Sequence, residues 1–203
     1  MDIWQTIIDW LHRIGLHIDP ETARAVGDAA GQVGDVAARA GQAVGQMDMA
    51  SMLALAAALG WASGMRLYAV VFLVGGMGAL GWIALPPALT VLQHPVVLMA
   101  SGFMLLVEFF ADKVPWLDSA WDAVHAFIRV PAGALLAAGV FGADNASMAV
   151  AAGLLGGTLS ATALATKMTA RAAANTSPEP FSNWGLSFLE DGLVVATVWL
   201  ATQ

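Results

Sequence analysis

Long runs of apolar residues constrain the fold of this chain more than any other feature of its sequence. A helix needs about 20 mostly apolar residues to cross the hydrocarbon core of a bilayer. Runs of about that length recur between short polar breaks, and we read them as five segments, at about 49–80, 95–111, 123–142, 147–170 and 184–201. The sequence therefore predicts an all-α integral membrane protein, a bundle of about five transmembrane segments.

Composition agrees with a bilayer as the solvent. Hydrophobic residues make up 59 % of the chain and charged residues 11 %, with a mean hydropathy of +0.72, whereas soluble domains carry about 25 % charged residues. The chain contains no cysteine, which excludes disulfides, thiolate zinc sites and cysteine nucleophiles. Its net charge of −7 argues against a nucleic-acid partner.

Two regions are expected: an N-terminal helical region over residues 1–48 and a transmembrane domain over residues 49–203. Residues 1–19 have the spacing of an amphipathic helix lying on the membrane surface, with one apolar face formed by Ile3, Ile7, Trp10 and Ile14. The following Ala/Gly-rich stretch reads either as an oligomerisation or lid helix or as a weakly helical arm.

The first transmembrane segment is too long for one straight crossing, and its glycines beside Arg66 predict a broken or strongly tilted helix. Lys and Arg near the segment ends fall on one side if the N-terminus is cytoplasmic. With five crossings, the C-terminus would then face the opposite side. We expect a multi-pass protein of the bacterial inner membrane.

The sequence also suggests an inverted repeat, in which segments one and two match segments four and five around segment three. Residues 59–63 can be aligned with 156–160, and residues 105–108, ending in Glu108, with 187–190, ending in Glu190. Equivalent segments would be an odd number of crossings apart, so the repeat would be inverted, as in many transporters. Chance similarity in an Ala/Gly/Leu-rich chain explains the match equally well.

Ionisable residues inside the apolar segments are the candidates for function, because each costs about 2.5 to 3.5 kcal/mol at a bilayer centre. Glu108 and Asp112 share one helix face, and Glu190 and Asp191 lie in the last segment. A polar stripe leads into segment three at spacings of four, three and four residues, formed by Asp118, Asp122, His125 and Arg129. Lys167 and Arg171 supply cations from segment four.

These residues predict either a transport pathway or a static ion-pair network that fixes helix register. The set is Glu108, Asp112, Asp118, Asp122, Arg129, Lys167, Arg171, Glu190 and Asp191, with Ser63, Arg66, Ser160 and Asn183 as secondary candidates. Neither a catalytic motif nor a histidine pair suited to a metal is present. We therefore expect no enzyme activity, no metal and no cofactor.

The run Glu108-Phe-Phe-Ala-Asp112-Lys113-Val-Pro115, continued to Asp122 and followed by residues 127–134, resembles a bacterial family of small integral membrane proteins, domain of unknown function 4126. The resemblance spans about residues 49–203 and leaves the first 48 outside it. It implies a membrane protein with these segments, and it implies no substrate, cofactor or catalytic residue.

The preferred functional prediction is a small transporter or channel for an ion or solute, with proton coupling through carboxylates that alternate between protonated and cation-paired states. Because five segments are few for a transporter, we expect a homo-oligomer in the lipid bilayer. The alternative is a membrane scaffold or accessory subunit, with structural charges and N-terminal helices that bind a partner. Lipid handling, a third alternative, would require a polar groove open to the bilayer.

Overall fold

The computed structural model describes three stretches of the chain and a few single residues before them: 48–114, 116–176, 181–202, Arg24, Asp28 and Gly31. Within these stretches every element is helical, in the order α3 (Met49–Ala79), η1 (Pro87–Gln93), α4 (Pro95–Ala111), α5 (Leu117–Phe141), η2 (Ala143–Asn145), α6 (Ala146–Ala174) and α7 (Phe181–Ala201). The all-α prediction is confirmed. The surface helix expected at residues 1–19 and the Ala/Gly-rich stretch after it lie outside the described stretches.

The helices begin and end close to the predicted segments, except at the start of α5. Hydropathy placed that start at residue 123, whereas the helix begins at Leu117. The difference arises because Asp118 and Asp122 are fully buried inside the protein, so the charged residues in the first turns of α5 face the interior. A hydropathy pattern cannot separate such residues from a loop.

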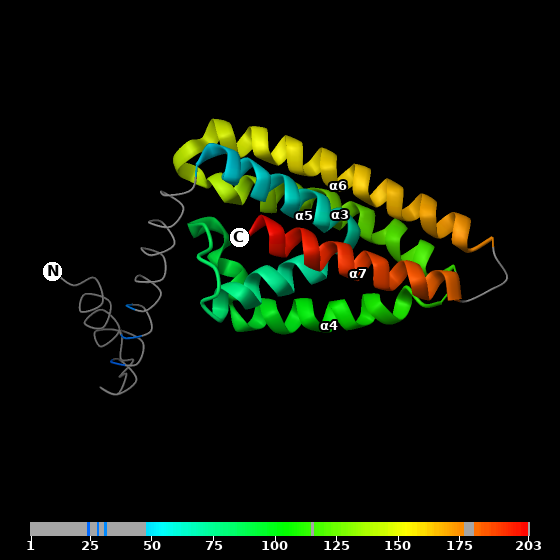
Figure 1. The fold of residues 1–203 in the computed structure, drawn as a ribbon. Coiled ribbons are helices and arrows are strands. Elements are labelled where there is room, and N and C mark those ends of the chain that lie inside the picture. Colours follow the sequence, from blue (N-terminus) through cyan, green and yellow to red (C-terminus); the bar gives the residue numbers. More distant parts are fainter. Residues whose placement is uncertain are drawn as a thin grey trace, which may run out of the picture.

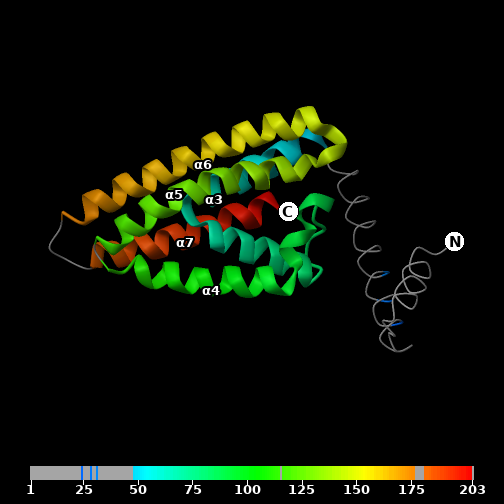
Figure 2. The ribbon, with the colours of Figure 1, turned by 180° about the vertical axis from the view of Figure 1, so that it is seen from behind.

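Helix α3 is broken in its middle, as its sequence predicts. Asp48 caps its start, where Ser51 N donates to Asp48 Oδ1 at 2.7 Å. At Arg66 the backbone leaves helical geometry, with φ −147° and ψ 82°. Figures 1 and 2 show the chain turning back at this break, so that both ends of α3 lie at the same end of the bundle.

The other helices run along the bundle in alternating directions (Figure 1). Helices α3, α5, α6 and α7 are long and apolar enough to cross a membrane, and η1 with α4 forms a fifth candidate bent by 67°. Because α3 returns to the end at which it begins, Asp48 and Thr202 line one common hollow. The expectation that the transmembrane domain begins and ends on opposite sides is corrected by this return.

Close contacts between small residues hold the first half of α3 against α6. A Cβ on Gly60 would run into the backbone of Gly156, and one on Gly64 into the backbone of Ser160. Helix α5 packs on the same strip, where a Cβ on Gly133 would lie 2.8 Å from Ser160 Cβ. Substitution of these glycines would therefore force the backbones apart.

The same contacts bear on the expected repeat. Positions 60 and 156, and then 64 and 160, meet in the same order, so the first half of α3 runs parallel to α6. Helices α4 and α7 run in opposite directions (Figures 1 and 2). An inverted repeat requires both equivalent pairs to be opposed, so it is not confirmed.

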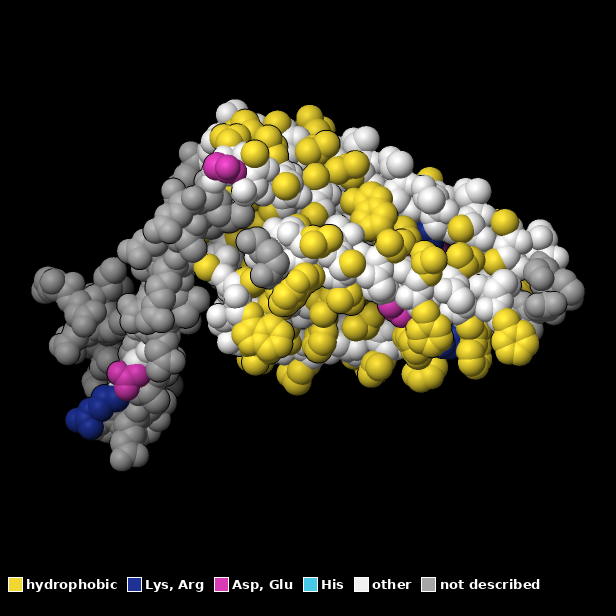
Figure 3. Space-filling model, in the orientation of Figure 1, with side chains coloured by type: hydrophobic (Ala, Val, Ile, Leu, Met, Phe, Trp, Pro, Cys, Tyr) yellow, Lys and Arg dark blue, Asp and Glu magenta, His cyan; other side chains and the backbone are white. Residues whose placement is uncertain are grey.

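The outer surface of the bundle is apolar. Large exposed hydrophobic side chains lie on every long helix, among them Phe72, Phe103, Phe127, Leu154 and Leu200. Figure 3 shows one face covered by hydrophobic side chains, with charged ones at only a few points. An apolar exterior around a charged interior is the arrangement expected in lipid.

Candidate functional site

Ten ionisable side chains from five helices meet inside the bundle, and we call them the charge network. Nine of these residues are at most 2 % exposed, and the exception, Asp191, has a side chain that is 30 % exposed. The members are Arg66, Glu108, Asp112, Asp118, Asp122, Arg129, Lys167, Arg171, Glu190 and Asp191.

Arg66 connects the break in α3 to α4 and α7. Its NH2 lies 2.8 Å from Asp112 Oδ2, and its Nε lies 2.9 Å from Asp191 Oδ1. The same NH2 donates to Ser187 Oγ at 2.8 Å. The side chain of the residue at the break is thus held by two helices far from it in sequence.

Lys167 occupies the centre of the charge network. Its Nζ lies 3.0 Å from Asp122 Oδ1, 3.6 Å from Asp112 Oδ1 and 3.6 Å from Glu190 Oε2. Glu108 Oε1 is 3.7 Å away. One ammonium group from α6 therefore faces carboxylates of α4, α5 and α7.

Arg129 links α5 to α4. Its NH1 donates to Asp122 Oδ1 at 2.6 Å, and its NH2 donates to Glu108 Oε1. Its backbone carbonyl accepts from Ser160 Oγ of α6 at 3.0 Å. Two carboxylates therefore share one guanidinium.

Arg171 and two asparagines complete the part of the charge network toward the end opposite Asp48. Arg171 makes a bidentate pair with Glu190, at 3.0 Å and 2.8 Å, and donates to the Asp112 carbonyl at 2.7 Å. Asn175 Nδ2 donates to Asp118 Oδ1 at 3.0 Å, and Asn183 Nδ2 donates to Asn175 Oδ1 at 2.7 Å. Helix ends of α4, α5, α6 and α7 are thereby tied together.

The structure brings all nine primary candidates into one network, although they are spread over residues 108–191. Arg66 and Asn183 also join it, and Ser160 joins through the Arg129 carbonyl. Ser63 does not, since its hydroxyl donates to the Leu59 carbonyl of its own helix at 2.6 Å.

Sequence reasoning missed two members of the site, Ser187 and Asn175. Ser187 lies three residues before Glu190 and so on the same helix face, a spacing that could have identified it. Asn175, the C-cap of α6, had no such signal. The predicted stripe on α5 is confirmed as a buried face, but His125 stacks on Trp121 with ring centroids 4.0 Å apart instead of forming an ion pair.

The charge network is not balanced. Six carboxylates face four cations, so two carboxylates are in excess when all are ionised. Lys113, in the turn after α4, donates to the Phe109 carbonyl at 3.0 Å and lies over the Phe109 ring instead of joining an ion pair. Partial burial lowers the pKa of Lys113.

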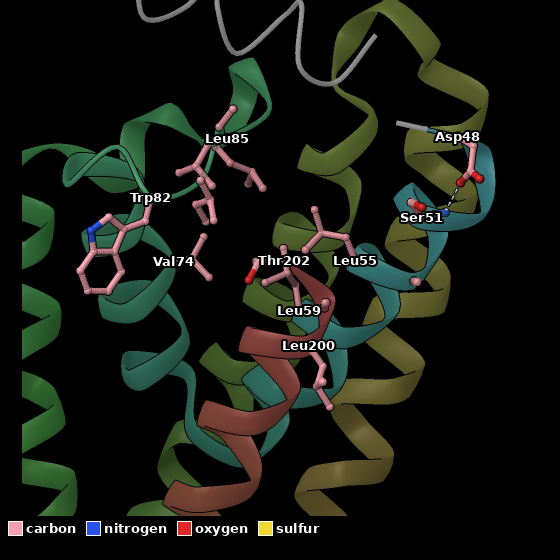
Figure 4. A pocket seen from close by; sticks show the side chains of 14 residues that line it. Asp48, Ser51, Leu55, Leu59, Val74, Trp82, Leu85, Leu200 and Thr202 are labelled. Carbon is pink, nitrogen blue, oxygen red and sulfur yellow. Dashed lines mark hydrogen bonds between the residues drawn. The ribbon is translucent and has the colours of Figure 1, made fainter. Parts of the chain in front are cut away.

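A hollow of about 640 Å³ opens between the two halves of α3 and the end of α7. Figure 4 shows Leu55 and Leu59 from the first half of α3 and Val74 from the second half around it, with Thr202 between them. Asp48 and Ser51 lie at its rim. Leu59 and Val74 belong to the two halves that meet at Arg66, so the hollow lies on the side of the break toward Asp48.

A second hollow, of about 520 Å³, lies on the side of the bundle between α3, η1, α4 and α5. Its lining is apolar apart from Tyr68 and Ser101. Neither of the two hollows is lined by a member of the charge network. In the described stretches no group of three or more His, Asp or Glu residues is placed to hold a metal ion.

Apolar membrane-length helices around a buried charge network define a multi-pass α-helical membrane protein. Residues 53–203 match the family model described as domain of unknown function (DUF4126), and the chain belongs to that family. No curated protein and no solved structure matches the chain.

Proposed function

We propose that this protein moves a small ion or solute across the bacterial inner membrane, using the hollow between the halves of α3 and the charge network as two parts of one route. The observation that supports this proposal is their placement in series. The hollow opens at the end that carries Asp48 and Thr202, and the charge network fills the bundle from Arg66 to the opposite helix ends.

The broken α3 is the element best suited to change shape. Re-entrant or broken helices beside polar sites are a recurrent device of transporters, where the free backbone groups line a route. Here the break places Arg66 among carboxylates of two other helices, and the Met65 carbonyl accepts from Lys167 at 3.4 Å. A change in the charges around Arg66 therefore acts directly on the break in α3.

The buried state of the charge network corresponds to a closed half of the route. Its nine inner members are at most 2 % exposed, so passage requires the helices to separate there. A hollow open at one end and a sealed polar region at the other match one state of alternating access. A homo-oligomer in the bilayer remains part of the proposal, and we propose neither enzyme activity nor a cofactor.

The test is flux of protons, small cations and small solutes in proteoliposomes, with wild type beside Glu108→Gln and Glu190→Gln. Both substitutions keep side-chain size and replace a carboxyl group of the charge network by an amide. We expect wild-type flux that both variants lose while keeping expression and oligomeric state. Asp28→Asn, at an exposed position, serves as the control and should retain full flux.

A second candidate, a membrane scaffold or accessory subunit, is favoured by the burial of every ion pair except that of Asp191 and by the tight α3–α6 contacts. Under this alternative the same Glu→Gln variants lose thermal stability, because breaking a buried ion pair costs about 3 to 5 kcal/mol. Absence of flux under every gradient, together with such a loss of stability, would favour the scaffold. The next step would then be to seek a partner for residues 1–48.

A further inference from the structure

The excess of acids in the charge network raises the question of what neutralises it. The network carries six carboxylates from α4, α5 and α7 and four cations from α3, α5 and α6. Of the other titratable groups close to it, Lys113 lies over Phe109 and is attracted by Asp191 and Asp112 without an ion-pair contact, and Tyr68 lies edge-on to His125 at 5.8 Å. Within the described stretches no fifth cation pairs with these carboxylates. Two uncompensated charges in a bilayer interior are strongly unfavourable.

Buried carboxylate oxygens without a hydrogen-bond partner belong to three acids, Glu108, Asp112 and Asp122. Glu108 and Asp122 share Arg129, and each uses one oxygen for that contact. Glu108 Oε2 and Asp122 Oδ2 are buried and have no hydrogen-bond partner. Both Asp112 oxygens also lack one, but three cations, Arg66, Lys167 and Arg171, lie within 4 Å of them. Lys167 Nζ also lies near the two oxygens that already contact Arg129, Glu108 Oε1 and Asp122 Oδ1. Glu108 and Asp122 thus share the guanidinium of Arg129, and they share the ammonium group of Lys167 with other carboxylates.

We propose that the charge network binds two protons, one of them on the Glu108–Asp122 pair, and exchanges them with the surroundings through Asp191. The inference deepens the proposed function by naming the proton as the ligand of the charge network. It rests on that function only for what the protons are used for, because their binding is measurable without transport.

Asp191 is the point of exchange because it alone among the ten members is open to the surroundings. Its side chain is 30 % exposed, against 3 % for Glu190 and none for the other carboxylates. It shares Arg66 with Asp112 and Glu190. Asp112 and Glu190 contact the same guanidinium, so they are the neighbouring carboxylates to which a proton on Asp191 would pass.

The contact of Asp191 with Arg66 links protonation of Asp191 to the break in α3. Arg66 reaches Asp191 through Nε and Asp112 through NH2, so both contacts pull on the residue at the break. Protonation of Asp191 removes the negative charge facing Nε and leaves the contacts of NH2. The hold of α7 on the break is then weaker, while that of α4 remains.

The number of bound protons can be counted by infrared spectroscopy of the full chain in nanodiscs at neutral pH, since protonated and ionised carboxyl groups absorb at different frequencies. We expect two protonated carboxyls in wild type and in the exposed control Asp28→Asn. Charge balance predicts one in Glu108→Gln and three in Lys167→Met. Wild type without a protonated carboxyl would overturn the proposal before any variant is needed, as would equal counts in folded Glu108→Gln and Lys167→Met.

The role of Asp191 is tested by the rate at which the protonated carboxyl band shifts after transfer to heavy water. Asp191→Asn and Glu108→Gln are a matched pair, because each should retain one bound proton. We expect exchange at least tenfold slower in Asp191→Asn than in Glu108→Gln, and the wild-type rate in Asp191→Glu. Equal rates in the matched pair would overturn the exchange route.

The proton count and the flux assay test the two proposals separately, so either proposal can be refuted without the other. Two bound protons without flux under any gradient would support proton binding and refute transport. Flux in a protein whose carboxyls are all ionised would support transport and refute proton binding.

Discussion

Replacement of Gly64 by alanine should separate α3 from α6 at the centre of the bundle. The new Cβ would lie 2.8 Å from the Ser160 carbonyl carbon and Cα, where carbon contacts normally measure about 3.5 to 4.0 Å. The atoms met are backbone, which cannot rotate away, so the helices must move apart by roughly 1 Å. Overpacking of this kind costs about 1 to 3 kcal/mol, against about 1 kcal/mol gained from the helix propensity of alanine.

The matched control is Gly76→Ala in the same helix, where a Cβ meets nothing within 4 Å. That variant should gain up to about 1 kcal/mol from helix propensity. Thermal unfolding in nanodiscs, followed by tryptophan fluorescence, measures both. On the scale of soluble chains of this size, about 2 to 4 °C per kcal/mol, we expect Gly64→Ala to unfold several degrees below wild type and Gly76→Ala slightly above it. Equal midpoints for the two variants would refute the contact argument.

Three further predictions concern a buried cation, the hollow and the cap of α3. Arg171→Met should cost about 3 to 5 kcal/mol, because Glu190 loses a buried bidentate partner, whereas the exposed Arg24→Met should leave the unfolding midpoint unchanged. Ala54→Trp, in the lining of the hollow, should lower flux while Ala151→Trp, on the exposed face of α6, should not; equal flux would dissociate the hollow from the route. The hydrogen bond from Ser51 N lowers the pKa of Asp48 below its ordinary value of 3.8. The cap therefore stabilises the fold above that value and is lost as the pH falls through the lowered pKa, so Asp48→Asn should reduce the acid-dependent loss of stability measured between pH 5 and pH 2.

Sequence patterns predicted the parts of this structure that depend on neighbouring residues. The spacing of Asp118, Asp122 and Arg129 places them on one face of a helix whatever that helix packs against, and the structure buries all three. The glycines near Arg66 likewise predicted a break, because they weaken the helix locally.

The direction of the chain after that break could not be predicted from the sequence. At the return of α3, Arg66 contacts Asp112 and Ser187, which are remote in the chain. The orientation argument failed for a related reason: Lys167 and Arg171 are buried in ion pairs, so they do not mark a membrane surface. Lys113, which the argument also counted, follows α4 at the end of the bundle opposite Asp48, so the cytoplasmic N-terminus stays a prediction.

The return of α3 also determines how copies of this domain can be joined. The described bundle begins at Asp48 and ends at Thr202 on one side, and both residues border the same hollow. Two copies fused head to tail would keep the same orientation without an additional membrane-crossing helix between them. Gene duplication and fusion in this family could therefore produce a parallel two-domain protein with nothing more than a linker outside the membrane.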